Sequence, residues 1–301
     1  MSASPLVSII TINYKQSGVT NALLQSLADV KAPSFEVLLV DNHSGPESID
    51  QLDLHYDFVR LIRSPRNLGF AGGNNLGIQK AIGKYILLLN NDTEVAPDFL
   101  EHLIRVFDER PNAGAVSPKI KYYEQPDTIQ YAGFTDMNPF TLRMRALGYQ
   151  QIDDGSWDQL RTTPFAHGCA MMVPRRVIDH VGLMPEAYFL YYEEHDWSYR
   201  IRQAGYQIYV APRSVVWHKE SMSVQKDSPL KTYYLNRNRI LYLRRNHQGL
   251  RKILASLYMI FVSIPKNLLA FGLFGDRQHW RAYCDALKWH LSPKMNDPWT
   301  P

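Results

Sequence analysis

Cysteine is scarce in this chain, which has only Cys169 and Cys284 among its 301 residues. Two cysteines so far apart do not form a disulfide framework, and they fit a reducing compartment. The chain also has no basic segment before its first apolar run, and that run, residues 7–12, is too short for the core of a signal peptide. We therefore expect a cytoplasmic protein.

Two common nucleotide-binding motifs are absent as well. The sequence contains no Gly-x-Gly-x-x-Gly fingerprint and no Gly-Lys-Thr or Gly-Lys-Ser phosphate loop. Residues 13–16, Asn-Tyr-Lys-Gln, are not the basic, glycine-rich loop that a sugar nucleotidyltransferase needs after its first strand. These absences make a dinucleotide oxidoreductase the least favoured function and leave a nucleotidyltransferase as a weak alternative.

Charge is unevenly distributed. The net charge of +4 points to no partner, and we expect no nucleic-acid binding. Residues 231–252, however, contain no acidic residue and seven basic ones: Lys231, Arg237, Arg239, Arg244, Arg245, Arg251 and Lys252. Such a stretch favours phosphate groups or an anionic membrane surface. With 45% apolar residues, the chain can form one large domain with an appendage.

In the first half of the chain, segments with the apolar pattern of strands alternate with segments with the apolar spacing of helices. Apolar runs predict strands at residues 6–12, 35–40, 59–62, 85–89 and 113–117. Helical spacing and start signals predict helices at residues 17–30, 72–82 and 97–109, with a short one from Pro46. This alternation predicts an α/β fold with a mostly parallel central sheet and helices on both faces.

The remainder is less regular. Residues 119–163 are expected to form strand fragments and long loops, where acceptor recognition is usual. Further strands are predicted at 165–173, 207–210 and 214–217, and helices at 175–181, 194–204, 230–246, 253–274 and 277–291. We therefore divide the chain into a domain at residues 1–225, with a regular half at 1–118 and a less regular half at 119–225, and a helical appendage at 226–301.

Polar residues follow two of the predicted strands directly. Asp41 ends one strand, and Asn90, Asn91 and Asp92 follow the apolar run at 85–89. In open α/β sheets ligands bind at this edge. Each residue has an ordinary alternative, because Asn and Asp also form turns. An acidic cluster at 193–196 opens a helix, where acids also favour the helix dipole. Together these features suggest a divalent metal, a nucleotide diphosphate and a base.

The chain resembles the family 2 inverting glycosyltransferases of the GT-A fold, and in particular their bacterial rhamnosyltransferase-like members. The matching stretches are 7–14, 39–44, 67–77, 90–92, 192–197 with Arg200, 205–206, and His218 with Ser221. They follow the family's order over about residues 6–223, and jointly they are specific.

The resemblance implies that residues 1–118 form the nucleotide-sugar-binding half and residues 119–225 the acceptor-binding half, and it implies roles for particular residues. Donor contacts are implied for Thr11, Asn13, Asp41, Asn67, Gly69, Asn75, Asn90 and Asn91. Asp92 occupies the last position of the family's Asp-x-Asp motif, and with His218 it would hold Mn²⁺ or Mg²⁺. The first position is Asn90 here, which removes one charge. The general base would be Glu194, with Asp196 and Glu193 as alternatives that more plausibly orient the acceptor or the helix.

The implied activity is metal-dependent, inverting transfer of a hexose or deoxyhexose. The donor would be a UDP- or dTDP-sugar and the acceptor a hydroxyl of a bacterial surface glycan. A non-catalytic nucleotide-sugar or glycan-binding protein with a decayed site remains an alternative, which Asn90 keeps open.

The apolar segment 253–274 is long enough to suggest a membrane span, but Pro265-Lys266-Asn267 is expected to interrupt it. An interfacial or re-entrant helix pair in the region 231–291, at the inner face of the cell membrane, fits better. A helix buried on the catalytic domain or on a second subunit of a homo-oligomer is the alternative. With a membrane contact, the acceptor would be a polyprenyl-diphosphate-linked glycan, whose diphosphate could meet Arg237, Arg239, Arg244 and Arg245.

Overall fold

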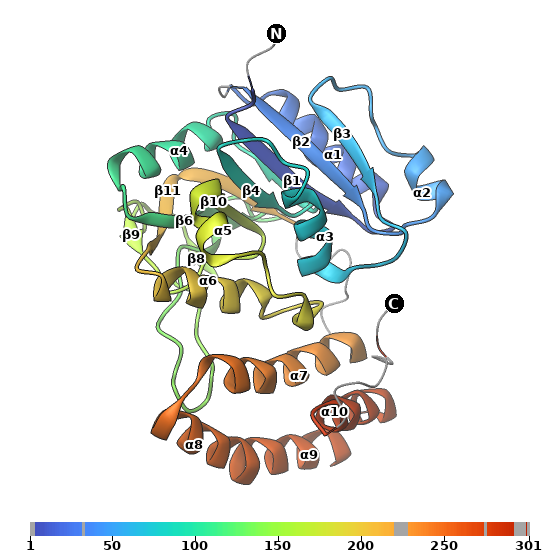
Figure 1. Cartoon of the computed structure of the whole chain (residues 1–301), viewed down its shortest axis with the longest axis vertical. Coiled ribbons are helices and arrows are strands. Elements are labelled where there is room, and N and C mark those ends of the chain that lie inside the picture. The colour runs from blue at the N-terminus through green and yellow to red at the C-terminus, as the bar shows by residue number, and fades with distance from the viewer. Residues whose placement is uncertain (1–3, 32–33, 220–227, 274–275, 292–298, 300–301) are drawn as a thin grey trace.

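The computed structural model describes residues 4–31, 34–219, 228–273, 276–291 and 299 (Figure 1). Ser221, which is among the residues that carry the family resemblance, lies outside the described residues. The strands form one mixed sheet in the order β3-β2-β1-β4-β10-β6-β11-β5, with three short strands beside this path. The α/β architecture predicted from the sequence is confirmed.

The first half supplies the parallel part of the sheet. Its strands are β1 (Val7–Asn13), β2 (Phe35–Asp41), β3 (Val59–Arg63) and β4 (Tyr85–Leu89). The connecting helices are α1 (Ser17–Ala28), α2 (Pro46–Asp50) and α3 (Gly69–Ile78). Every residue of β4 is buried, as expected for a central strand covered on both faces. Parallel pairing aligns the carboxyl ends of these strands at one edge.

The second half extends the same sheet with both strand directions. Its elements are β5 (Thr93–Val95), α4 (Phe99–Glu109), β6 (Ala113–Tyr122), β10 (Ala170–Pro174), α5 (Arg175–Val181), η1 (Glu186–Tyr188), α6 (Glu193–Gln203) and β11 (Gln207–His218). Strand β10 is antiparallel to both β4 and β6, and β11 runs parallel to β6 and antiparallel to β5. Helices cover both faces, with α1 and α4 on one and α3, α5 and α6 on the other.

Two regions of predicted strand differ from the structure. The strand predicted at 165–173 begins only at Ala170, because the backbone N–H of Cys169 bonds to Nδ1 of His167 in a turn. The two strands predicted at 207–210 and 214–217 form one strand, β11, whose register shifts between Ala211 and Val215. Residues 119–163 contain the end of β6 and the short strands β7 (Thr128–Tyr131), β8 (Gln151–Ile152) and β9 (Arg161–Thr162), as expected for fragments and loops.

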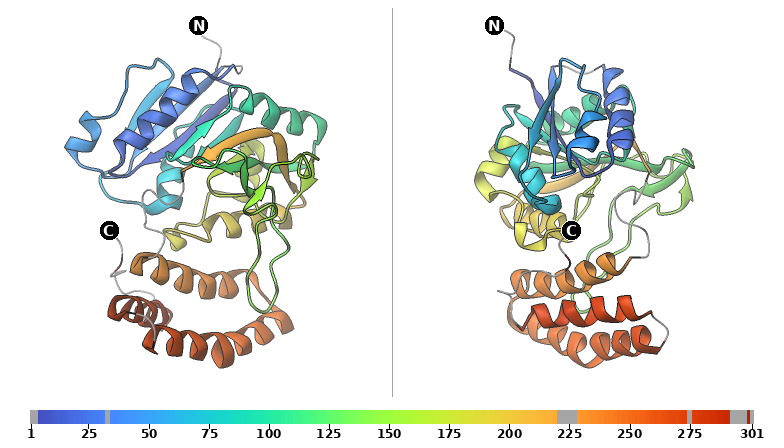
Figure 2. Two further views of the ribbon diagram at one scale, coloured as in Figure 1. Left: turned by 180° about the vertical axis from the view of Figure 1, so that it is seen from behind. Right: turned by 90° about the vertical axis from the view of Figure 1, so that its right-hand side faces the viewer.

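The C-terminal helices form a layer of their own beside the sheet domain (Figures 1 and 2). They are α7 (Pro229–Asn246), α8 (Gly249–Tyr258), η2 (Met259–Ser263), α9 (Ile264–Leu273) and α10 (Arg277–Trp289). Helix α7 lies between α6 and the α8–α9 helix in both figures.

The expected interruption at Pro265-Lys266-Asn267 is wrong. Residues Gly249–Leu273 form one helix of 25 residues. The segment η2 is a π-helical turn that ends two residues before Pro265. Proline lacks an N–H and its ring crowds the preceding turn. A wider turn with a shifted hydrogen-bond pattern relieves both conflicts, so the helix continues through the proline.

Candidate active site

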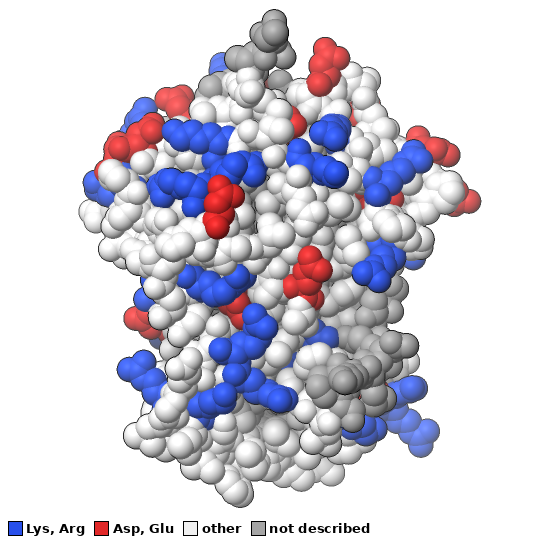
Figure 3. Space-filling model, viewed as in Figure 1, with Lys and Arg blue, Asp and Glu red and all other residues white. Residues whose placement is uncertain are grey.

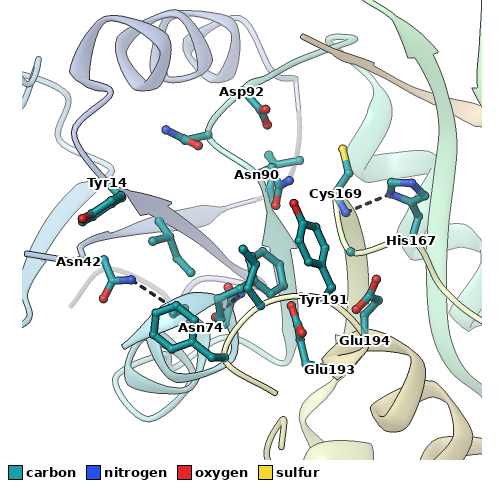
Figure 4. A pocket seen from close by; sticks show the side chains of 18 of the residues that line it. Tyr14, Asn42, Asn74, Asn90, Asp92, His167, Cys169, Tyr191, Glu193 and Glu194 are labelled. Carbon is teal, nitrogen blue, oxygen red and sulfur yellow. Dashed lines mark hydrogen bonds between the residues drawn. The ribbon is translucent and has the colours of Figure 1, made fainter. Parts of the chain in front are cut away.

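A cavity of about 520 Å³ lies at the carboxyl edge of the parallel strands. This volume is in the range of about 300–1,000 Å³ that is usual for small-molecule sites. Its walls come from both halves of the sheet domain and from the first turn of α7. Figure 4 shows Asp92 on one side of it and Glu193 and Glu194 on another. All three segments therefore contribute to this one site.

Sheet register brings Asp92 and His218 together. Strand β5 pairs antiparallel with the end of β11, so that His218 is the register partner of Thr93. The backbone N–H of Lys219 also bonds to the carbonyl oxygen of Asp92 at 2.8 Å. As a result, Nε2 of His218 lies 3.2 Å from Oδ1 of Asp92, although the two residues are far apart in the sequence.

Gln130 of β7 orients the His218 ring. Its Oε1 lies 2.9 Å from Nδ1 of His218, in the buried part of the site. When Nδ1–H donates to this oxygen, the Nε2 lone pair faces the carboxylate oxygen of Asp92. Two electron-pair donors at this distance are favourable only with a cation or a proton between them. Such a hydrogen-bonded second partner is typical of metal-binding histidines.

A carboxylate oxygen and an imidazole nitrogen suit Mn²⁺ better than Mg²⁺, which prefers oxygen ligands. In the described part of the chain, no group of three or more His, Cys, Asp or Glu side chains could hold a metal ion. The Asp92–His218 pair therefore fits a metal whose remaining ligands come from a bound diphosphate and water.

Glu193 and Glu194 both line the cavity from the first turn of α6, and they differ in environment. Glu193 is only 3% exposed. Burial, and after it the neighbouring charge of Glu194, raises the pKa of Glu193 well above its ordinary value. The side chain of Glu194 is 17% exposed, with Oε1 lying 3.3 Å from Nδ1 of His195. Its Oε2 has no hydrogen-bond partner among the described residues. Glu194 is thus the better placed acceptor of a proton.

Asp196 does not line the cavity. Its carboxylate accepts hydrogen bonds from Tyr188, Arg200, Arg245 and Asn246, at 2.9 to 3.2 Å. These partners come from η1, α6 and α7, so Asp196 joins three elements. This arrangement agrees with a role in orienting the helix and leaves no free oxygen for acceptor chemistry.

The segment before the two glutamates has a strained backbone. Phe189, Tyr191 and Tyr192 have φ values of 63°, 69° and 76°, which non-glycine residues rarely adopt. Strain of this kind persists only when surrounding contacts fix it. Gly69 is one such contact: its φ is 68°, and a Cβ on it would lie 2.3 Å from the carbonyl oxygen of Phe189. Only glycine lets α3 approach this segment so closely.

Helix α7 supplies the other contacts. The amide nitrogen of Asn238 lies 2.7 Å from the carbonyl oxygen of Leu190 and 2.8 Å from that of Tyr191. The guanidinium of Arg237 donates to the carbonyl oxygen of Ala187 at 2.9 Å. Asn238 and Arg237 are buried. The C-terminal helices therefore hold the segment that carries the glutamates.

Sequence comparison identifies the class of protein that has this site. A profile described as glycosyl transferase family 2 matches residues 8–182, which is more than half of the chain. The chain belongs to glycosyltransferase family 2. It is therefore a glycosyltransferase, and the family resemblance inferred from the motifs is confirmed.

Curated relatives of this glycosyltransferase act in glycan assembly. The low-salt glycan biosynthesis hexosyltransferase Agl10 of Haloferax volcanii is 28% identical over 240 residues, covering 78% of this chain and 74% of Agl10. The dTDP-rhamnosyl transferase RfbF of Shigella flexneri is 25% identical, covering 90% of this chain and 92% of RfbF. The N-acetylglucosaminyl-diphospho-decaprenol L-rhamnosyltransferase of Mycobacterium tuberculosis is 22% identical, with coverages of 81% and 86%.

Solved structures show that the glycosyltransferase has the GT-A fold. The mannosyltransferase PcManGT of Pyrobaculum calidifontis, in complex with GDP-Man and Mn²⁺, superposes with a TM-score of 0.60 at 15% identity, covering 98% of this chain and 89% of its own. GalNAc-T7, with UDP, GalNAc and Mn²⁺, gives a TM-score of 0.63 at 14% identity. This chain spans 53% of the length of GalNAc-T7 and is covered to 97%.

The glycosyltransferase places its predicted donor residues in two groups. Asn67, Gly69, Asn90 and Asn91 line the cavity together with Asp92. Four others do not line it: Thr11, Asn13, Asp41 and Asn75. Strand side chains alternate between faces, so Ile12, Tyr14 and Asn42 point into the cavity in place of their neighbours.

The four residues outside the cavity are buried in other contacts. Asn13 bonds to Ser44 and Thr20, and Asp41 accepts from the backbone N–H of Ser44. The amide of Asn75 donates to the carbonyl oxygen of Met184 and to Glu186. Thr11 is fully buried. These side chains lie behind the residues that line the cavity and do not face it.

Sequence reasoning missed several residues that line the site. They are Tyr14, Asn42, His167, Tyr191, Leu230 and Lys231. Burial lowers the pKa of His167 to about 3, so its ring is neutral at physiological pH. Among the described residues lining the cavity, Lys231 is the one Lys or Arg. Its place at the start of a basic helix was visible in the sequence, but its place in the same cavity as Asp92 was not.

The suggested contact of four arginines with an acceptor diphosphate is wrong for two of them and is not supported for the other two. Arg237 and Arg239 are buried and donate to backbone carbonyl oxygens, those of Ala187 and Thr141 among them. Arg245 is paired with Asp196, and Arg244 bonds to the carbonyl oxygen of His290. Buried carbonyl groups need donors, and these arginines provide them.

Proposed function

We propose that this glycosyltransferase is metal-dependent and inverting. It would move a hexose or deoxyhexose from a UDP- or dTDP-sugar to a hydroxyl of a bacterial surface-glycan acceptor. One observation carries the proposal: a single cavity has the Asp92–His218 pair on one wall and the Glu194 carboxylate on another. Leaving-group stabilisation and proton removal thus have separate places in one site.

The residues have separate roles in a single nucleophilic displacement. Asp92 and His218 would hold the metal, which offsets the charge that develops on the leaving nucleoside diphosphate. Lys231, at the start of α7, adds a positive charge to the same cavity. Glu194 accepts the proton of the acceptor hydroxyl through Oε2 as that oxygen bonds to the anomeric carbon. Attack opposite the leaving group inverts the anomeric centre, and no covalent sugar–enzyme intermediate is required.

The buried glutamate has a different role in this scheme. Because the pKa of Glu193 is raised, its carboxyl holds a proton more readily than an exposed glutamate does. A protonated Glu193 is a poor base and a hydrogen-bond donor. We assign proton removal to Glu194 and acceptor orientation to Glu193.

The names of relatives support the substrate classes. RfbF is named for a dTDP-rhamnosyl donor, and the Mycobacterium tuberculosis relative for an acceptor on a polyprenyl diphosphate. Two solved neighbours contain Mn²⁺ with a nucleotide or nucleotide sugar. We extend these classes to the present chain as donor, acceptor and metal.

Transfer of labelled sugar from a panel of UDP- and dTDP-sugars, with and without Mn²⁺, tests the proposal. Glu194→Gln should bind the donor normally and lose transfer by about 10²–10⁴-fold. Glu124→Gln, an exposed acid outside the cavity, is the matched control and should keep full activity. A near-normal rate for Glu194→Gln would refute the base assignment. Nucleotide binding without turnover of any donor would favour a non-catalytic binding protein.

A further inference from the structure

The helix Gly249–Leu273 presents a long apolar face to solvent. By length and composition it could cross a membrane, and only 17% of its most apolar window is buried. Its exposed large apolar side chains fall in two groups: Leu250, Ile253, Leu254, Leu257, Ile260, Phe261 and Val262 in the first half, and Leu269 and Leu273 in the second. We name these residues the outer face. Soluble proteins rarely expose so continuous an apolar surface without a partner.

The opposite side of this helix is packed on the protein. Ala255 and Met259 are buried against Leu142 and Leu243. Ser263 is buried as well, and its hydroxyl accepts a hydrogen bond from Arg239 at 3.2 Å. A helix fixed along one side cannot be surrounded by lipid as an isolated span is. The structure therefore favours a helix that lies on a surface over one that crosses a bilayer.

Basic residues outnumber acidic ones in the C-terminal helices that include the outer face. Across the described residues 228–291 the acidic side chains are Asp276 and Asp285, and Asp285 is paired with Arg281 and Lys288. The exposed or half-buried basic residues of α7 to α10, apart from Lys231 in the cavity, are Arg244, Arg245, Arg251, Lys252, Lys266, Arg277, Arg281 and Lys288. Figure 3 shows Lys and Arg side chains gathered in a band just above the uncharged lowest part of the molecule.

An apolar face with a basic rim is complementary to anionic phospholipid. Lysine and arginine near such a surface each strengthen binding, and apolar side chains enter the boundary between headgroups and acyl chains. A second copy of this chain is a poorer match, because a symmetric contact through the outer face would bring two basic rims together. The charge distribution therefore favours an anionic membrane over a second copy of this chain as the partner of the outer face.

We propose that the outer face of Gly249–Leu273 lies on an anionic phospholipid bilayer, with its apolar side chains inserted and the surrounding lysines and arginines on the headgroups. The helix runs parallel to the bilayer surface, and α7 separates it from the sheet domain (Figures 1 and 2). Since the first turn of α7 lines the active-site cavity, docking would bring the cavity to the membrane on which a lipid-linked acceptor resides. This last consequence rests on the proposed function, whereas the docking itself does not.

Flotation of the full chain with vesicles tests docking without any substrate. The wild type should float with vesicles of equal phosphatidylcholine and phosphatidylglycerol, and much less with phosphatidylcholine alone. Replacing Ile253, Leu257 and Phe261 by Gln together should lower the partition coefficient more than about tenfold. Three exposed apolar residues of the sheet domain, Leu54, Ile82 and Ile152, replaced by Gln together, form the matched control and should leave it unchanged.

A second variant, Arg251→Gln with Lys266→Gln, keeps the test independent of the apolar substitutions. It should weaken binding to anionic vesicles by about fivefold per charge and leave the weak binding to phosphatidylcholine unchanged. Failure of the wild type to float with anionic vesicles overturns the proposal, as does unchanged flotation of both variants. A solution dimer that the apolar substitutions convert to a monomer, without vesicle binding, would identify a second copy as the occupant and also overturns it.

Discussion

Asn238 of α7 donates a hydrogen bond of 2.8 Å to the carbonyl oxygen of Tyr191, two residues before Glu193. This contact links a helix outside the sheet domain to the backbone that carries Glu193 and Glu194. The C-terminal layer is thus part of the active site's support as well as a candidate membrane surface. Removal of this layer should impair catalysis more strongly than it destabilises the sheet.

Substitution of Asn238 by Ala should therefore impair both stability and transfer. The amide serves the carbonyl oxygens of Leu190 and Tyr191, and buried carbonyls left without donors cost about 1–3 kcal/mol. We expect a lower melting temperature by calorimetry and at least about a tenfold loss of kcat. Asn236→Ala, on the same helix, removes a bond to its own helix at Thr232 and a 3.5 Å contact with Asn267; neither bond reaches residues 190–193, so kcat should be unchanged. Equal effects of the two substitutions would contradict this role.

Gly69→Ala tests whether close approach, and not backbone conformation alone, requires glycine. Gly69 and Gly205 both have positive φ, at 68° and 89°, but a Cβ on Gly205 would meet nothing within 4 Å. Gly69→Ala should thus cost about 1–3 kcal/mol more than Gly205→Ala in urea unfolding, because of the clash with Phe189. It should also lower kcat, whereas Gly205→Ala should not. Similar unfolding free energies for the two variants would show that the clash is relieved by movement.

Metal binding should depend on the nucleotide and on the orientation of His218. Because the described residues supply a carboxylate and an imidazole at 3.2 Å, Mn²⁺ alone should bind weakly and bind more tightly with UDP or dTDP present. Gln130→Ala releases the ring and should lower Mn²⁺ affinity about 10–100-fold, measured by electron paramagnetic resonance titration. Gln125→Ala, an exposed glutamine, is the control. Unchanged Mn²⁺ affinity in Gln130→Ala would contradict the assignment of His218 as an oriented metal ligand.

The raised pKa of Glu193 predicts a pH-dependent stability difference. The folded chain holds this proton where the unfolded chain has lost it, so the stability contribution is present in acid and is lost as the pH rises through the folded-state pKa. Glu193→Gln cannot ionise. The melting temperature of Glu193→Gln relative to wild type should therefore rise between about pH 5 and about pH 9. Measurements in EDTA exclude metal effects, and a difference that stays flat would show that Glu193 is not shifted.

Much of the fold follows from local patterns in the sequence. The strand Tyr85–Leu89 and the helix Arg175–Val181 have the bounds predicted from their apolar runs and flanking residues. The convergence of Asp92 with Glu194 in one cavity was also expected, from the rule that ligands bind at strand ends. Local periodicity is sufficient to predict a strand or helix whose bounds depend on its own residues alone.

The remaining errors arise where tertiary contacts decide. Arg237 and Arg239 resemble a phosphate-binding surface in the sequence, yet they satisfy carbonyl oxygens of segments 50 and 98 residues away. The role of Gln130 depends on its pairing with His218, 88 residues away. The passage of the helix through Pro265 depends on the π-helical turn before it. None of these partners can be identified from spacing along one element.

Strand β10 lies between β4 and β6 and pairs with both, so the second half of the chain is inserted into the sheet of the first. A chimera joined near residue 118 would therefore cut a shared core, and neither piece should fold alone. The segment between β7 and β9 is different, because it lies off the main strand path. Exchanging residues 132–160 between homologues would leave that path intact, but Leu142 packs on Leu243, Ala255 and Met259, so the graft must preserve this contact with the C-terminal helices.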